Sequence, residues 1–180
     1  MTTPVPPDGI TPDDKDWTWV VERPCPECGF DASGFERELV GSMVLANAAA
    51  WQRVLRGPSV DRRPKPTVWS PLEYGCHVRD VFCIYDERLE RMLEEDDPQY
   101  ANWDQDATAV DDDYGAQDAA TVAEELVLAA ARIANRFNSV AGEQWSRTGT
   151  RSDGAHFTVE SFARYLIHDP VHHLWDVETR

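Results

Sequence analysis

The sequence predicts an all-α fold, a four-helix bundle built as one domain. Four long segments repeat apolar residues at three- and four-residue steps, which is the period of an amphipathic helix. No convincing run of strands lies between them. The chain has 180 residues, enough for one well-filled core by the usual ~100–200 residues per domain. We therefore expect a single domain over residues 17–180, preceded by a short tail.

The predicted tail comprises residues 1–16. It carries four prolines and four aspartates and shows no apolar period. Such a segment cannot bury enough surface to offset the entropy lost on ordering, so we expect a disordered, acidic and proline-rich tail. The aromatic and β-branched stretch that follows, 16–21, predicts an extended lead-in that packs Trp17 or Trp19 on the core.

The first two helices have clear start or stop signals in the sequence. The first is predicted from Asp31 to the Gly-Pro pair at 57–58. The second begins behind Ser70, where a serine cap, Pro71 in the first turn and Glu73 three residues after the cap form a helix-start signature. Its apolar face indicates that it continues to about residue 95.

The second half of the chain supplies the other two helices. Residues 96–118 are rich in Asp and lack a sustained helical period, so they predict a loop, and loops of this length are usually functional or mobile. The third helix is predicted over 117–140 and the fourth from Thr158 onward. Pro170 lies inside the fourth segment, where it removes a backbone hydrogen bond to Leu166, and this predicts a kink or a restart at Asp169.

Charge and composition exclude several classes of partner. Seventeen Lys and Arg stand against 33 Asp and Glu, a formal net charge of −16. A surface this acidic repels phosphate backbones and anionic headgroups, which disfavours nucleic acid and membrane as partners. No stretch approaches the ~20 apolar residues of a membrane span, and the first residues lack the pattern of a secretory signal. We expect a cytoplasmic protein whose four cysteines are thiols or metal ligands.

Three of the five histidines fall within six residues near the end of the chain. His168 and His172 are four apart, so on a helix their imidazoles lie one above the other and can converge on one ion. Such a pair needs a further ligand from another element, and His77 on the second helix is the candidate. The alternative is that each histidine is an ordinary core or boundary residue.

The remaining histidines have weaker signals. His173 points about a quarter-turn away from its neighbour, and Asp169 lies four residues before it, so a helix-surface pair is expected. His156 lies in a polar connector, and the sequence indicates no role for it.

The motif Cys25-Pro-Glu-Cys28-Gly is a second chemical signal. Two thiolates two residues apart before a glycine are typical of a zinc knuckle. A structural zinc needs two further ligands, and the sequence has no second CxxC. Cys76 and Cys83 could complete a four-cysteine site, although small buried side chains are the simpler interpretation. A redox-active CxxC is another alternative, but no βαβ pattern accompanies it.

Other polar residues are candidates for supporting roles. Glu73 lies four residues before His77, and Asp176 lies four residues after His172, so either could orient a metal ligand. Trp103 and Arg151 are candidates for the border of a substrate cleft, where arginine could grip a carboxylate or a thiol-cofactor group.

Two of these motifs resemble a known family. The stretch Trp-Ser-Pro-Leu-Glu-Tyr-Gly-Cys-His over 69–77 is similar to the start of the second helix in the DinB-like superfamily, which includes mycothiol-dependent maleylpyruvate isomerases. The stretch His-Asp-Pro-Val-His over 168–172 is similar to the HxxxH of that family's fourth helix. The resemblance covers the four helices, roughly residues 31 to 178, and the chain departs from the pattern at Pro170.

The resemblance implies an up-down-down-up four-helix bundle with a divalent metal, often zinc or nickel, near one end. Carried onto this chain, the ligands would be His77, His168 and His172, with coordination positions left open. It also makes a homodimer and a low-molecular-weight thiol such as mycothiol reasonable expectations. Because one fold serves several chemistries, the reaction does not follow from it.

The sequence thus supports three hypotheses about function. The first is a metal-dependent transferase, isomerase or hydrolase acting on a small molecule. The second is a non-catalytic metal-binding or ligand-sensing bundle. The third is a thiol or redox protein in which Cys25 and Cys28 are the active element.

Overall fold

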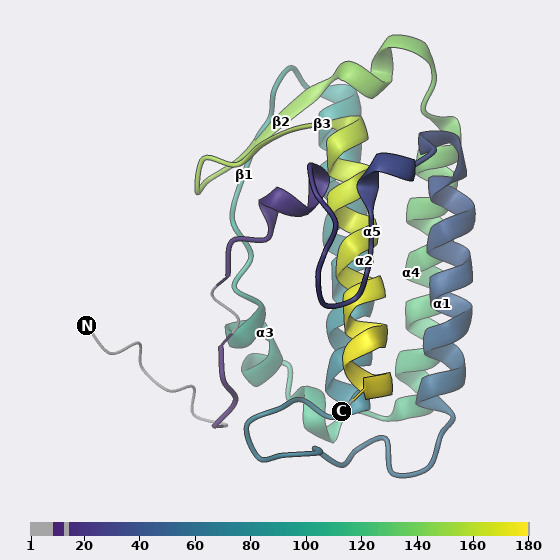
Figure 1. The fold of residues 1–180 in the computed structure, drawn as a ribbon, viewed down its shortest axis with the longest axis vertical. Coiled ribbons are helices and arrows are strands. Elements are labelled where there is room, and N and C mark those ends of the chain that lie inside the picture. Colours follow the sequence, from purple (N-terminus) through teal and green to yellow (C-terminus); the bar gives the residue numbers. More distant parts are fainter. Residues whose placement is uncertain (1–8, 13–14, 180) are drawn as a thin grey trace.

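The computed structural model describes residues 9–12 and 15–179. Its framework is a bundle of four long helices (Figure 1). This confirms the predicted all-α, four-helix fold, with the second, third and fourth helices within two residues of their predicted starts. The four helices are α1 (Val40–Leu55), α2 (Pro71–Glu94), α4 (Ala119–Ser139) and α5 (Val159–Thr179).

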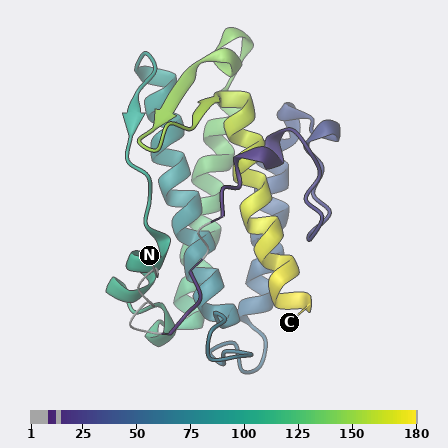
Figure 2. The ribbon, with the colours of Figure 1, turned by 60° about the vertical axis from the view of Figure 1, so that its left-hand side comes forward.

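The helices follow the expected up-down-down-up order. Helices α1 and α5 run in one direction, while α2 and α4 run in the other (Figures 1 and 2). This order requires a connection that returns along the full length of the bundle between α2 and α4, and the segment 95–118 provides it (Figure 1). Helix α4 packs against α1 and α2, and α5 packs against the same two helices.

The start of α2 is built as predicted. The Ser70 hydroxyl accepts a hydrogen bond from the Glu73 amide at 3.2 Å, and the Glu73 carboxylate accepts one from the Ser70 amide at 2.7 Å. This capping box fixes the first turn of the helix and therefore the position of His77, which follows within two turns.

The connection between α2 and α4 is more structured than the predicted loop. It contains the strand β1 (Gln99–Tyr100), the helix α3 (Gln105–Asp111) and a 3₁₀ turn (Tyr114–Ala116). Asp104 caps α3 by accepting a hydrogen bond from the Ala107 amide. The prediction of a segment without helix was wrong here because a seven-residue helix is too short to show a sustained period.

A small sheet was also missed. Strand β1 pairs in parallel with β2 (Thr148–Arg151), which pairs in antiparallel fashion with β3 (His156–Thr158). Strands of two to four residues carry too little alternation to be recognised in the sequence. A 3₁₀ turn (Gly142–Ser146) links α4 to β2.

The chain before α1 differs from the expectation as well. Helix α1 starts at Val40 instead of Asp31, and 3₁₀ turns (Thr18–Val21, Ala32–Gly34, Arg37–Leu39) precede it. Within the predicted tail, Ile10 is buried against the core and the Thr11 amide donates to the Thr67 carbonyl. Residues 1–8 and 13–14 of that tail lie outside the described residues.

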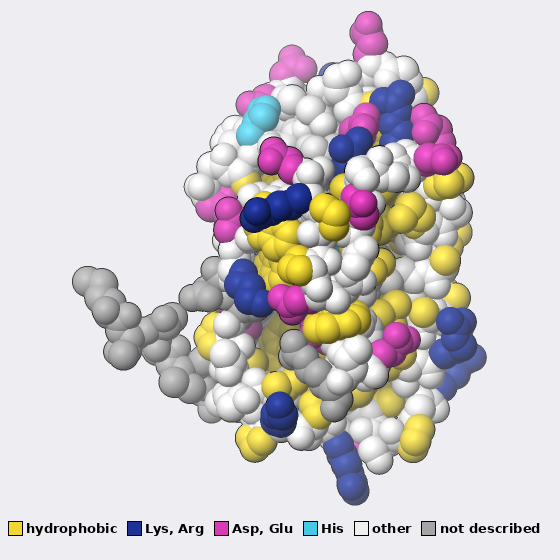
Figure 3. Space-filling model, viewed as in Figure 1, with side chains coloured by type: hydrophobic (Ala, Val, Ile, Leu, Met, Phe, Trp, Pro, Cys, Tyr) yellow, Lys and Arg dark blue, Asp and Glu magenta, His cyan; other side chains and the backbone are white. Residues whose placement is uncertain are grey.

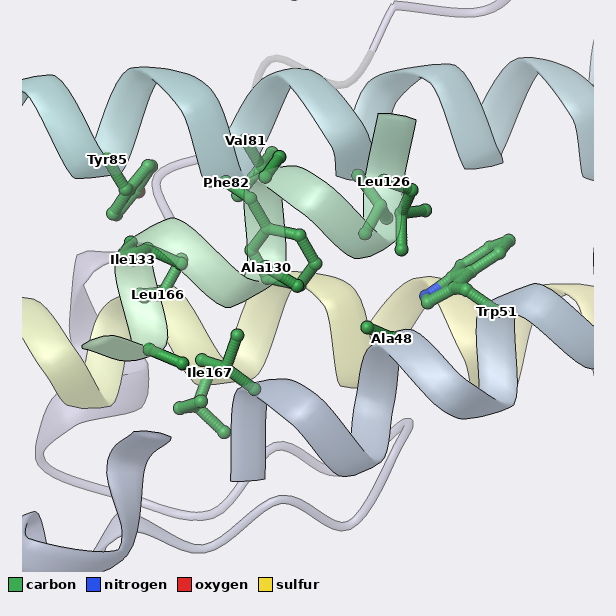
Figure 4. Close-up of a cluster of buried hydrophobic side chains, with 14 of the residues drawn as sticks. Ala48, Trp51, Val81, Phe82, Tyr85, Leu126, Ala130, Ile133, Leu166 and Ile167 are labelled. Atoms are coloured by element: carbon green, nitrogen blue, oxygen red, sulfur yellow. The ribbon is translucent and has the colours of Figure 1, made fainter. Parts of the chain in front are cut away.

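The core fills the space between the four long helices (Figure 4). Phe82 of α2 meets Leu126 and Ile133 of α4, with Trp51 of α1 and Leu166 of α5 in the same cluster. All five side chains are fully buried. Among the described residues, no helix combines the length and apolar character needed to cross a bilayer.

Helix α5 passes through Pro170 without interruption. The predicted restart at Asp169 therefore does not occur. The Trp51 indole donates a hydrogen bond to the Pro170 carbonyl at 3.2 Å, which ties this part of α5 to α1. The spacing of the histidines on either side of Pro170 is consequently that of one helix.

Candidate functional site

Helix α5 presents two pairs of potential ligands on neighbouring flanks. Because successive residues of a helix are rotated by about 100°, His168 and His172 share one flank while Asp169 and His173 share the next. One flank faces the chain before α1, and the other faces α2. The predicted three-histidine set is therefore divided between two clusters.

The first cluster, here the triad, consists of His77, Asp169 and His173. Each offers one ligand atom, and these atoms lie within 4.8 Å of one another. Nε2 of His77 lies 3.2 Å from Oδ1 of Asp169, and Nε2 of His173 lies 3.8 Å from the same oxygen. The pairing of His173 with Asp169 is as the sequence indicated, but His77 joins this pair instead of His168 and His172.

The second cluster, here the Cys-His cluster, consists of Cys25, Cys28, His168 and His172. Its four ligand atoms also lie within 4.8 Å of one another. The His168 and His172 rings are 5.1 Å apart between centroids, and Sγ of Cys25 lies 3.7 Å from Nδ1 of His172. Neither Cys76 nor Cys83 belongs to it: the Cys76 thiol faces Tyr114 and Gln117, and the Cys83 thiol faces Arg132.

Of the two carboxylates predicted to orient metal ligands, Asp176 lies beside a histidine and Glu73 does not. Asp176 is buried, with an oxygen 3.0 Å from Nδ1 of His173 and 3.9 Å from Nε2 of His172. It can therefore orient His173 through a hydrogen bond, whereas it lies near His172 only as an opposite charge. Glu73 is buried beside Arg63 and Ser70 and serves the start of α2 instead of orienting His77.

The electrostatic surroundings of Asp169 favour its charged form. Burial opposes ionisation, but the facing imidazole of His77, its hydrogen bond, and the nearby His173 and His168 outweigh this effect and hold the pKa of Asp169 well below its ordinary value. A carboxylate that stays ionised is an available ligand for a cation. Burial and the neighbouring His173 lower the pKa of His172, which favours the neutral imidazole that metals require.

A hollow of about 470 Å³ opens beside the triad. Asp169 and His173 border it, and His77 lies fully buried behind Trp103, whose ring stacks on the imidazole at 5.2 Å and 7°. Lys15 to Trp17 form part of its wall. The surface is hollowed here between hydrophobic and charged side chains (Figure 3).

Both predicted cleft residues line this hollow. The Arg151 guanidinium, however, already binds Asp153 through two hydrogen bonds and contacts the Tyr165 hydroxyl. It is therefore less available to a ligand than the sequence suggested.

Arg88 is the cation that the sequence did not indicate. It lines the hollow, is only 8% exposed, and donates to the Ala101 carbonyl at 2.9 Å. Its guanidinium lies over the rings of Tyr100 and Tyr85, and burial lowers its pKa. Within residues 9–12 and 15–179, no carboxylate forms an ion pair with it. Nothing in the sequence distinguished Arg88 from the other charged residues of α2.

Comparison with known proteins identifies the family. The family model described as DinB superfamily matches residues 40–177. This chain belongs to the DinB superfamily. The match spans α1 to α5 and includes the triad, whereas Cys25 and Cys28 lie before its first residue. Among curated proteins, none matches the chain.

A solved structure shares the fold of this DinB superfamily member. YfiT from Bacillus subtilis superposes with a TM-score of 0.70 at 15% sequence identity, covering 87% of this chain and 92% of its own. It is described as a probable metal-dependent hydrolase with an unusual four-helix bundle topology. At this identity the similarity establishes the fold.

Proposed function

We propose that this protein is a metal-dependent enzyme that acts on a small molecule bound in the hollow. In this proposal a divalent ion is held by His77, Asp169 and His173. The observation that carries it is the convergence of two imidazoles and one carboxylate at the edge of the hollow. The description of YfiT as a probable metal-dependent hydrolase is consistent with such a role.

The donor set suits a divalent metal. Two histidines and one carboxylate are a combination found in catalytic zinc and iron sites. Asp176 lies 3.0 Å from Nδ1 of His173, which leaves Nε2 of that ring directed at Asp169. A carboxylate that holds the outer nitrogen of a ligating histidine is a recurrent feature of metal sites.

The number of ligands favours catalysis over a structural role. Three protein ligands leave coordination positions for water or substrate, and the Asp169 and His173 side chains border the hollow from which these would arrive. An ion bound there would lower the pKa of a bound water or thiol and polarise a carbonyl group. Hydrolysis and thiol-dependent transfer or isomerisation are both within this chemistry.

The residues around the triad would bind and orient the substrate. Arg88 offers a buried guanidinium without a carboxylate partner among the described residues, so a substrate with a carboxylate or another anionic group would find its complement there. Trp103 covers His77 and excludes water from it. A low-molecular-weight thiol such as mycothiol is one candidate co-substrate.

The test is to measure metal content and activity together. Untagged protein would be analysed for zinc and nickel, then assayed for hydrolysis of small amides and esters and for mycothiol-dependent isomerisation of maleylpyruvate-like substrates. We expect an activity that chelation removes and that His77→Ala abolishes, while His156→Ala, which changes an exposed histidine, leaves it intact. Turnover that survives both chelation and His77→Ala would refute the proposal. Bound metal without any turnover would favour a non-catalytic bundle.

A further inference from the structure

The Cys-His cluster has the composition of a complete zinc site. We propose that Cys25, Cys28, His168 and His172 bind one structural zinc ion that fastens the N-terminal segment to α5. The site is separate from the triad, so the inference does not depend on the proposed catalytic function. Cys25 and His172 are 147 residues apart in the sequence, and the fold brings them together.

The local backbone at the two cysteines suits metal binding. The Cys25 amide donates to the Phe30 carbonyl at 2.8 Å, and the Gly29 amide donates to the Cys25 carbonyl at 3.0 Å. Gly29 has a φ of +74°, which glycine adopts without strain. The resulting tight turn directs both sulfur atoms toward the same flank of α5. Two thiolates from a CxxC turn and two imidazoles from an HxxxH helix are an established tetrahedral zinc combination.

Three of the four side chains of the cluster are buried, and its two histidines also border the hollow. Cys25, His168 and His172 are 1%, 3% and 5% exposed, and Cys28 is half-buried. The Trp17 ring lies over both imidazoles, with centroid distances of 5.1 and 4.8 Å. Four protein ligands under an aromatic cover leave no position for a substrate, which is the arrangement of structural zinc sites.

The N-terminal segment contains little regular structure. Between residues 15 and 30 the only regular element is one 3₁₀ turn. The same stretch supplies Lys15, Asp16 and Trp17 to the wall of the hollow. A zinc ion at the cluster would therefore hold one wall of the proposed substrate site in place.

The redox alternative for Cys25 and Cys28 has less support. All four cysteines are thiols in the structure. Cys25 lies beside His172 and His168, in a group of four ligand atoms, instead of beside a substrate-accessible surface of its own. When zinc binds, each cysteine thiol would instead release its proton to solvent and bind the metal as a thiolate.

Cobalt substitution of the full-length protein tests the inference. A cobalt ion bound to thiolates shows sulfur-to-metal charge-transfer absorption, which a site made of histidine and aspartate cannot produce. We expect this absorption in the wild type, its loss in Cys25→Ser/Cys28→Ser, and its retention in His77→Ala. Cys83→Ser serves as the cysteine control and should leave it unchanged. Zinc analysis should show about one equivalent fewer per chain in the double variant.

A second measurement covers the case in which the double variant fails to fold. In the wild type, Cys25 and Cys28 should resist alkylation when zinc is present and react after chelation, as located by mass spectrometry. Absence of the charge-transfer absorption in the wild type would overturn the inference. So would a native protein that is purified without chelator, contains no zinc and holds a Cys25–Cys28 disulfide. Loss of activity in His77→Ala with the absorption retained bears on the triad alone.

Discussion

Nε2 of His77 lies 3.2 Å from Oδ1 of Asp169, a contact that joins α2 to α5 across 92 residues of sequence. Both side chains lie beside Trp103, whose ring covers the His77 imidazole. This contact shows which flank of α5 faces His77. His168 and His172, one residue earlier on the same helix, lie on the neighbouring flank and face Cys25 and Cys28.

Replacing the carboxylate of the triad tests whether it is a ligand. Asp169→Asn keeps the shape of the side chain but removes the charge, so we expect loss of the metal ion from the triad and of the activity that depends on it. Asp169→His restores a ligand of another kind and should recover part of the occupancy. Elemental analysis and calorimetric titration of the two variants measure this. Equal metal affinity in wild type and Asp169→Asn would show that the carboxylate is not a ligand.

Asp176 is predicted to act through His173, with which it shares a hydrogen bond. Asp176→Asn should weaken metal affinity by about 10–100-fold, the usual cost of losing a carboxylate behind a ligating histidine. Glu178→Gln is the matched control, because Glu178 lies on the same helix but is exposed. Competition with a chelator gives both affinities. The idea fails if the two variants bind metal equally well.

The pH dependence of stability should reflect the buried Glu73. Burial opposes its ionisation, but Arg63 and the Ser70 amide outweigh this and hold the pKa of Glu73 below its ordinary value. A depressed carboxyl pKa stabilises the fold at pH values above the unfolded pKa of about 4.3. That contribution is lost as the pH falls from there through the folded pKa.

Glu73→Gln removes this titration while keeping an oxygen for the Ser70 amide. We expect the free energy of unfolding to fall by about 1–2 kcal/mol at pH 7. The difference from wild type should shrink toward zero as the pH falls below about 4. Urea unfolding at several pH values measures it, with the exposed Glu124→Gln as control. A difference that is constant across pH would contradict the assignment.

Arg88 and Arg136 allow a comparison between an arginine proposed to bind the substrate and an arginine that stabilises the fold. Arg136 pairs with Asp86, which is buried, and with Glu90. Arg136→Met leaves the Asp86 charge unpaired and should cost about 3 kcal/mol.

For Arg88→Met we expect a smaller loss of about 1–2 kcal/mol, because the hydrogen bond to Ala101 and the contacts with the Tyr100 and Tyr85 rings disappear but no buried carboxylate is left unpaired. Thermal or urea unfolding ranks the two variants. If Arg88→Met proves the more damaging of the two, Arg88 is a structural residue and its proposed role toward the substrate loses support.

Local signals were sufficient for the main helices. The Ser70 capping box and the long apolar periods of α2 and α4 act within a few residues, so the sequence shows them directly. The 3₁₀ turns before α1, the helix α3 and the two- to four-residue strands are too short to leave a pattern. Their formation depends on packing against the bundle.

The sequence by itself indicated where candidate ligands lie: in the CxxC pair, in the histidines four apart on the last helix, and in a histidine on the second. It could not determine how these residues are grouped. Helical spacing places His168 with His172 and Asp169 with His173, but it contains no information about which neighbour each pair faces. Only the packing of α2 against one flank of α5 and of the N-terminal segment against the other separates the candidate ligands into the triad and the Cys-His cluster. These contacts span 92 and 147 residues of sequence, and that separation is why tertiary structure had to decide them.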